Sequence, residues 1–177
     1  LTPSQNLLLC DVAKEDIDEI NSILSSNDVA IEETEQGTLL QRGAMACPAL
    51  PTCGLSLAES ERYLPEFLGV VEDVLAEEGL AEEQIIVRMT GCPNGCARPY
   101  MAELGIVGRS PGKYAVYLGG NADSTRLGRL YNQNVKVDEM KAMLGPIVSR
   151  FKNEREAGEG FGDFCARTIW PEMEVAE

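Results

Sequence analysis

Residues 85–96 read IIVRMTGCPNGC, and this stretch decides how the rest of the sequence is interpreted. Its first five residues are β-branched or apolar apart from one arginine, which predicts a short strand. The strand leads directly into a loop, where Pro93 and the turn dipeptide Asn94-Gly95 disfavour a helix. Because such a loop can turn back on itself, Cys92 and Cys96 can point the same way.

A second cysteine pair lies in an equally irregular stretch. Residues 39–53 read LLQRGAMACPALPTC, and Cys47 is followed by Pro48 just as the first cysteine of the other pair is followed by proline. Glycine and two prolines around Cys47 and Cys53 favour a loop over a helix or a long strand. The sequence thus presents two cysteine pairs, each in a loop.

Four thiolates on two loops are the ligand set of one tetrahedral zinc ion or one four-iron cluster. Structural zinc sites usually use tight Cys-x2-Cys pairs, whereas this chain has Cys-x5-Cys and Cys-x3-Cys, so the spacing favours the cluster. The ordinary alternative is that these cysteines act as small buried apolar residues. Two cysteine pairs, each in an irregular loop, argue against this alternative. For Cys10 and Cys165, which lie outside the pattern, that alternative is the better interpretation.

Composition excludes several classes of function. The 177 residues carry 15 Lys+Arg against 29 Asp+Glu, a net charge of −14, and no His. Such an acidic chain is a poor general binder of nucleic acid or of an anionic membrane. Without His it supplies no His-dependent catalytic dyad and no His-ligated metal. One segment runs against the trend: residues 85–130 have six basic residues and only two acidic ones, a setting that suits an anionic group.

No apolar run approaches the roughly 20 residues that span a bilayer, and no secretory signal opens the sequence. We therefore expect a cytoplasmic protein, or a plastid one if the source is a photosynthetic eukaryote. Because the sequence opens on Leu1 and not on Met, we expect the chain to be a piece of something longer.

The remaining elements predict a mixed α+β (α/β) fold. Apolar periodicity predicts helices over 13–25, 66–79 and 137–155, although Pro146 could break the third. Ser56-Leu57-Ala58-Glu59 has the form of a capping box and predicts a helix that Pro65 ends or kinks. Strands are predicted over residues 1–10 and, as a hairpin, over 104–107 and 114–118. The Gly-rich stretch from residue 158 is expected to be an ordered extension without an element of its own.

Several stretches of the sequence resemble the motifs of a known family. The stretches 45–53 and 88–98 resemble the siroheme and iron–sulfur signature of the sulfite and nitrite reductase family, and the likeness continues through 102–108, 118–121 and 154–164. It covers essentially the whole chain. Within the family, the likeness is to the C-terminal third of assimilatory sulfite reductase haemoprotein (beta) subunits.

The resemblance implies a fold, a cofactor pair and a reaction. Residues 1–37 would end a ferredoxin-like unit, 38–157 would form the nitrite/sulfite reductase 4Fe-4S domain, with a mixed sheet flanked by helices, and 158–177 would be an extended tail. Cys47, Cys53, Cys92 and Cys96 would ligate a 4Fe-4S cluster, and the Cys96 sulfur would also bridge to the iron of siroheme. The reaction implied is the six-electron reduction of sulfite to sulfide.

Other site residues are assigned more weakly. Asn94 is assigned to the edge of the cluster or siroheme, although turn formation explains it equally well. A guanidinium suits planar carboxylates, so Arg98 is assigned to a siroheme carboxylate in preference to a local cap. Gly119, Gly120 and Asn121 are assigned to the wall of the cofactor cavity, with a tight turn as the alternative. No catalytic residue is assigned in this chain.

The resemblance also implies partners. The rest of the reductase would supply the Arg and Lys residues that bind sulfite and most siroheme carboxylates, and electrons would come from a flavoprotein or a ferredoxin. Two alternatives stay open: a siroheme nitrite reductase that makes ammonia, and a non-catalytic fragment or zinc-binding structural module.

Overall fold

The computed structural model describes residues 2, 7–29 and 37–175, and its contacts divide the chain into two compact units, 1–38 and 39–177. In the first unit, a 3-10 turn over Lys14–Asp16 leads into helix α1, Ile17–Ser26, where a helix is predicted. Residues 7–10 form no strand, so the strand predicted over 1–10 is wrong for these residues. Of the remaining residues of that predicted strand, the structure describes Thr2, while 1 and 3–6 lie outside the described residues. No residue of α1 is buried, and residues 7–10 are exposed and pair with no strand of the described residues.

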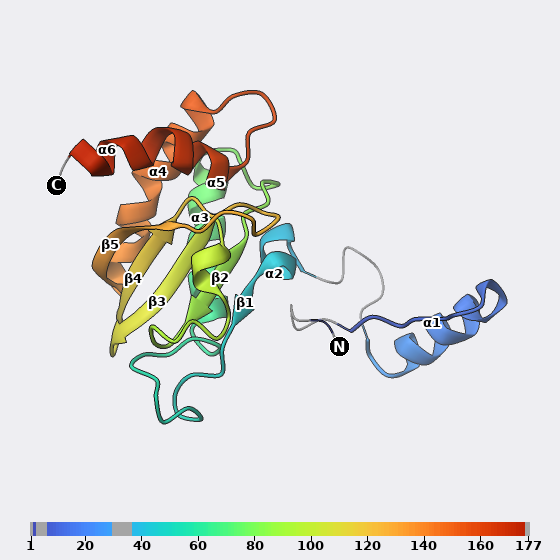
Figure 1. The fold of residues 1–177 in the computed structure, drawn as a ribbon. Coiled ribbons are helices and arrows are strands. Elements are labelled where there is room, and N and C mark those ends of the chain that lie inside the picture. The colour runs from blue at the N-terminus through green and yellow to red at the C-terminus, as the bar shows by residue number, and fades with distance from the viewer. Residues whose placement is uncertain (1, 3–6, 30–36, 176–177) are drawn as a thin grey trace. The chain divides into compact units, whose positions relative to one another are not determined.

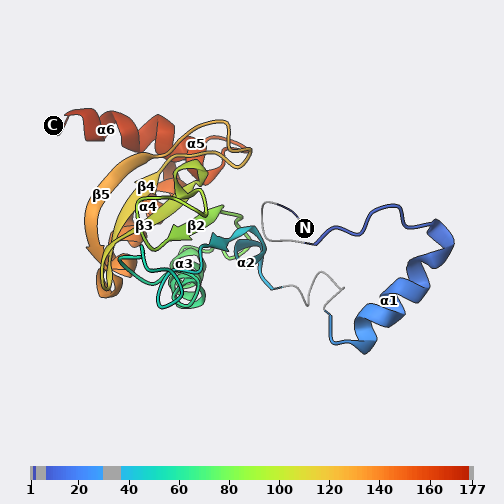
Figure 2. The same cartoon turned by 60° about the horizontal axis from the view of Figure 1, so that its bottom comes forward.

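The second unit is built on a five-stranded mixed sheet, which confirms the predicted mixed α/β class. The strands are β1 Met45–Ala46, β2 Val87–Thr90, β3 Leu104–Ser110, β4 Lys113–Leu118 and β5 Arg129–Lys136. They lie in the order β1-β2-β3-β4-β5, with β1, β2 and β3 mutually parallel and the remaining pairs antiparallel. Figure 2 shows β5 at one side of the sheet, away from β1. The predicted hairpin is β3–β4.

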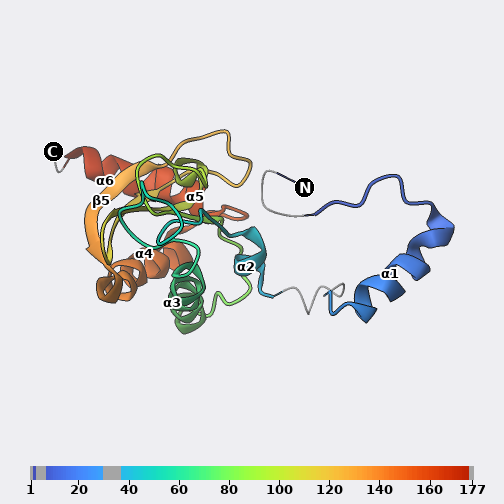
Figure 3. The same ribbon diagram turned by 90° about the horizontal axis from the view of Figure 1, so that it is seen from below.

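Two helices cover one face of the sheet. They are α3, Leu64–Glu77, and α4, Met140–Glu154, which contact each other and lie on the same side of the strands (Figure 3). Their buried residues join alternate strand residues in one core that includes Phe67, Met89, Ile106 and Phe151. Alternate residues of β2, such as Arg88, point to the other face.

The C-terminal stretch is helical, so the predicted extension without an element is wrong. It contains α5 Phe161–Phe164, a π-helical segment Cys165–Ile169 and α6 Trp170–Val175, drawn in red close to α4 in Figure 1. Phe161, Phe164, Cys165 and Ile169 are all buried, a helical spacing that the glycines before it obscure in the sequence. The rings of Phe161 and Phe164 both lie 5.5 Å from that of Phe151 in α4.

A buried carboxylate also holds this C-terminal stretch. Glu103, 4% exposed, accepts hydrogen bonds from the Ile86 N–H at 2.8 Å and the Gly162 N–H at 2.9 Å. Burial raises the pKa of Glu103, although both hydrogen bonds oppose the shift. Gly162 is needed here because a Cβ at this position would overlap the Gly120 carbonyl.

Other predictions need correction. No helix begins at Ser56: its hydroxyl donates to the Ala58 carbonyl, while the N–H groups of Leu57 and Ala58 donate to the Gly91 carbonyl across the fold. Pro65 instead lies in the first turn of α3, where a missing N–H costs nothing.

The stretch 39–53 is less irregular than predicted, because a short helix α2, Leu39–Gly43, precedes β1. Pro146 lies inside α4 without ending it. Strand β5 is missing from the prediction because most of its side chains are exposed, so its sequence RLYNQNVK shows little apolar alternation. No helix of the described residues is long and apolar enough to cross a membrane.

Candidate functional site

The two cysteine loops leave the same edge of the sheet. Cys47 directly follows β1, and Gly91 and Cys92 directly follow β2. The two strands are parallel, with Met45 opposite Arg88, so their carboxyl ends meet at one edge. In Figure 1 the loop that follows β1 extends below the sheet. The carboxyl edge of parallel strands is where open α/β sheets bind ligands.

Hydrogen bonds tie the loops together. The Gly91 N–H donates to the Sγ of Cys47 at 3.3 Å, and the Cys47 N–H donates to the Met89 carbonyl at 3.2 Å. The Gly91 carbonyl accepts from Leu57 and Ala58, at 2.8 and 3.0 Å. A Cβ on Gly91 would overlap Ser56 Oγ and lie 2.5 Å from the Ala58 carbonyl oxygen, so this position requires glycine.

The four cysteines differ in burial. Cys47 and Cys92 are buried, Cys53 is half-buried and Cys96 is exposed, and all four are free thiols. Within the described ranges, no three side chains of His, Cys, Asp or Glu converge as a metal site. The fold thus brings the two loops together but does not gather their sulfurs around one point, and the four-thiolate site stays a prediction.

The donor chemistry of the loops nevertheless fits an iron–sulfur group. A backbone N–H already points at the Cys47 sulfur, and hydrogen bonds to sulfur are one of the protein's means of tuning such clusters. Cys96 presents its thiol outward, where a group outside this chain can reach it.

The turn after Cys92 positions the other predicted residues of this loop. Gly95 has φ +68°, and its carbonyl accepts from the Arg98 N–H at 2.7 Å, which closes the turn. Asn94 lies exposed on this turn. Arg98 is half-buried, also left-handed with φ +55°, and its Nη2 lies 3.7 Å from the Sδ of Met45 in the strand that leads to Cys47.

The predicted cavity-wall residues pack against their own chain. A Cβ on Gly119 would lie 2.6 Å from Nε1 of Trp170, and one on Gly120 would overlap the Ala102 carbonyl. The Asn121 side chain bonds Thr125 Oγ1 and the Arg126 N–H, both at 2.8 Å. These contacts account for the three residues as a packed turn, and their role at a cofactor stays a prediction.

The sequence assigns no individual role to Arg88, which lies in β2 opposite Met45 of β1 and contacts the Ser124 hydroxyl at 3.4 Å. It is 8% exposed, and its Nε and Nη1 have no hydrogen-bond partner among the residues that the structure describes. Burial lowers the pKa of Arg88, and the nearby positive charge of Arg98 lowers it further. The signal in the sequence was a single charge inside the apolar run IIVRM.

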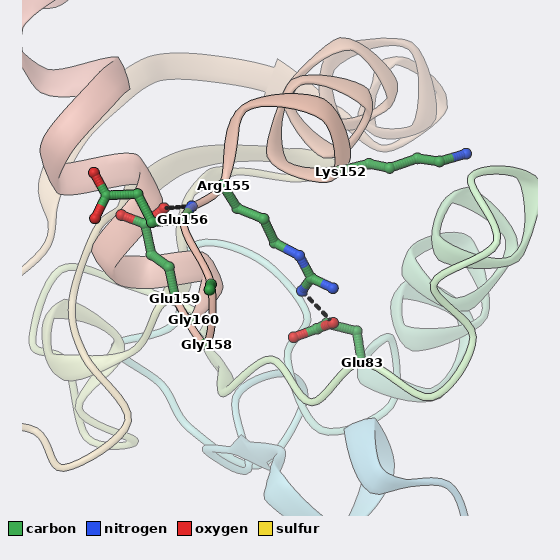
Figure 4. A pocket seen from close by; sticks show the side chains of 8 residues that line it. Glu83, Lys152, Arg155, Glu156, Gly158, Glu159 and Gly160 are labelled. Atoms are coloured by element: carbon green, nitrogen blue, oxygen red, sulfur yellow. Dashed lines mark hydrogen bonds and ion pairs between the residues drawn. The ribbon is translucent and has the colours of Figure 1, made fainter.

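A hollow lies beside the end of α4, with a volume of about 670 Å³ (Figure 4). Its cations already have partners: Arg155 Nη1 lies 2.6 Å from Glu83 Oε2, and Lys152 Nζ lies 3.7 Å from Glu78. The Glu156 N–H donates to Glu159 at 2.9 Å and closes the loop that forms the wall. These pairs join the end of α4 to the segment after α3, and they leave neither cation of the hollow free to bind an anion.

Comparisons with known proteins agree with the resemblance seen in the cysteine motifs. No family model matches the chain. The "Sulfite reductase [NADPH] hemoprotein beta-component" of Staphylococcus carnosus is 49% identical over 167 residues, which are 94% of this chain and 29% of that protein. Its namesake in Myxococcus xanthus is 47% identical with the same coverage. The solved structure of Mycobacterium tuberculosis NirA protein matches with a TM-score of 0.71 and 27% identity, over 94% of this chain and 32% of that one. The chain thus spans about three tenths of these relatives.

Proposed function

We propose, from the premise that this chain is homologous to about 30% of the sulfite reductase haemoprotein beta-component, that it is the cluster-bearing part of a sulfite reductase. One observation in the structure carries the proposal. The two cysteine loops leave the carboxyl ends of neighbouring parallel strands and are joined by the hydrogen bond from Gly91 N–H to Cys47 Sγ. A thiolate cluster would lie at that edge.

In this proposal Cys47, Cys53, Cys92 and Cys96 hold a 4Fe-4S cluster. The cluster and siroheme would store electrons from the donor and relay them to sulfite. The Gly91 N–H donates to one ligand sulfur, which stabilises negative charge on it. The exposed thiol of Cys96 fits the ligand that also bridges to the siroheme iron. Asn94 and Arg98, on the turn around it, would flank that bridge.

The rest of the reductase completes the proposed site. Because the chain spans about three tenths of its relatives, the Arg and Lys residues that bind sulfite and most siroheme carboxylates are proposed to lie in the remaining seven tenths. The relatives' name includes NADPH, which favours an NADPH-fed flavoprotein over a ferredoxin as the electron donor.

Anaerobic reconstitution tests the cluster. We expect the chain, treated with iron and sulfide, to hold about four irons and to gain the broad absorbance of a 4Fe-4S cluster. Cys92→Ser and Cys96→Ser should each lose most of that absorbance, because each removes one of four ligands. The matched control is Cys10→Ser, an exposed cysteine of the first unit, which should load like the unchanged chain.

Two results would contradict the proposal. One is equal cluster absorbance in all three cysteine variants. The other is a purified chain that takes up one zinc ion and no iron, which would favour the zinc-binding structural module. Nitrite is the rival substrate, and assays of the whole reductase with sulfite and with nitrite separate the two.

A further inference from the structure

Tyr100 contacts the backbone of the turn that joins Cys92 and Cys96 at two points. Its hydroxyl donates to the Pro93 carbonyl at 2.9 Å. Its ring lies beside Gly95, where an added Cβ would be 2.9 Å from Cε2 of the ring. Pro93 directly follows the first cysteine of the turn, and Gly95 directly precedes the second. One side chain therefore touches both ends of the turn.

Between the two cysteines, the hydrogen bond of the backbone itself is weak. The Gly95 N–H reaches the Cys92 carbonyl at 3.4 Å, which is long for an N–H···O bond, and Pro93 has no N–H to donate. Pro93, Asn94 and Cys96 are exposed, so little packing restrains this stretch. A segment with few buried contacts opens easily, so a contact from outside the turn can decide its shape.

Tyr100 is itself anchored to the sheet. It lies in the 3-10 turn Pro99–Met101, and its carbonyl accepts the Gly128 N–H at 2.7 Å. Its ring meets the ring of Tyr117 in β4 edge to face, with 4.9 Å between the ring centres. The side chain thus connects the cysteine turn to the regular part of the sheet.

We propose that Tyr100 is a positioning residue that fixes the turn and so holds the thiols of Cys92 and Cys96 ready to bind one metal centre together. The bond to Pro93 satisfies no buried group, because Pro93 is exposed and water can take the place of the hydroxyl. Its effect is to restrict the turn. Two ligands that are held in place before binding lose less conformational entropy when they bind. That the metal centre is a cluster rests on the proposed function, whereas the restriction of the turn does not.

The first test measures the thiol pair in the reduced, metal-free chain. The probe is phenylarsine oxide, whose arsenic forms bonds to two thiols while its oxygen leaves as water. Titration, alkylation of the remaining thiols and digestion with trypsin give its affinity at peptide 89–109, which holds Cys92 and Cys96 and no other cysteine. Tyr100→Phe should weaken this affinity by about fivefold, the factor that one neutral hydrogen bond contributes. A role in overall stability alone would leave the affinity of the folded chain unchanged.

The matched control is Tyr117→Phe. It removes the same atom from the ring that packs against Tyr100, and it should bind the arsenical like the unchanged chain. A further comparison needs no variant to fold: the unchanged chain should bind the arsenical more tightly when folded than when denatured in urea, because only the folded chain holds the turn.

The second test measures the cluster. After reconstitution, Tyr100→Phe should release iron to a chelator about fivefold faster than the unchanged chain, because its turn opens more often. Tyr117→Phe should release iron at the unchanged rate. The inference is overturned if the two variants bind the arsenical equally well, if they release iron equally fast, or if the folded and the denatured chain bind the arsenical equally. An unchanged chain that takes up no iron would contradict the proposed function, while the arsenical comparisons would still decide the role of Tyr100.

Discussion

Gly91 is the residue on which the junction of the two cysteine loops depends. Its N–H contacts Cys47, its carbonyl accepts two N–H groups, and the space beside its Cα is filled by Ser56, Ala58 and Ala49. A Cβ added to Gly91 would therefore overlap protein atoms.

Gly91→Ala should therefore destabilise the chain by about 1–3 kcal/mol, the range for overpacking a filled site. Urea unfolding measures the loss. Gly69→Ala is the control, since Gly69 lies in α3 with no atom within 4 Å of an added Cβ, and alanine there should stabilise the helix by about 0.5–1 kcal/mol. Equal effects of the two substitutions would show that the junction is not tightly packed.

Glu103 gives the fold a pH dependence of defined sign. Because burial raises its pKa in the folded state above the ordinary value of 4.5, the folded chain binds this proton more tightly than the unfolded chain does. Stability should accordingly fall as the pH rises from about 4.5 through the raised pKa, and Glu103→Gln should remove this part of the slope. Urea unfolding of both proteins over this pH range measures the difference. A difference between them that does not change with pH would contradict the expectation.

At the scale of elements, the C-terminal helices are held to the sheet through Trp170. Its Nε1 donates to the Leu118 carbonyl at 2.9 Å, and the Arg129 guanidinium lies 4.4 Å from the centre of its ring. Gly119, with φ +88°, gives the indole room to approach the strand end.

Gly119→Ala should lift Trp170 from the strand end, because the added Cβ would lie 2.6 Å from its Nε1. As the chain has one tryptophan, a red shift of its emission at low urea reports the displacement. Gly112→Ala is the control for backbone strain alone, since Gly112 also has positive φ but no atom near its Cβ. The same red shift in both variants would contradict a role for close packing at Gly119.

The elements that the sequence predicted well are those with strong apolar periodicity: α1, α3, α4 and the β3–β4 hairpin. The errors have local physical causes. No helix begins at the predicted capping box, residues 56–59, because the N–H groups of Leu57 and Ala58 donate to the Gly91 carbonyl. This is a contact between distant residues, which no local pattern reveals. For the site, the cysteine spacing predicted which two loops meet. The burial of the Arg88 guanidinium could not be predicted, because it follows from the register of β2 in the sheet.

At the scale of the whole molecule, the two units differ in how many side chains they bury. The main core comes entirely from residues between Leu40 and Ile169, while no residue of α1 is buried and Ile17 and Ile23 are 44% and 55% exposed. Among the described residues of the first unit, none belongs to this core.

A chain that comprises residues 39–177 should fold with nearly the same stability as the full chain. Thermal unfolding followed by near-UV circular dichroism should give midpoints within about 2 °C of each other, because 1 kcal/mol shifts the midpoint of a domain of this size by about 2–4 °C or slightly more. A midpoint that falls by 10 °C or more would mean that residues 1–38 stabilise the second unit.

The short ladder between β1 and β2 has a consequence for the order of folding. Only two residue pairs join these strands, and the bond from Gly91 to Cys47 closes a loop of 44 residues, whereas β3 and β4 are joined by a tight turn. Closing a long loop costs more chain entropy than closing a short one, so local hairpins form before distant strands pair. We expect the cysteine edge to be assembled last, on a sheet that already exists, which makes the loading of any group at that edge a late event in the maturation of the protein.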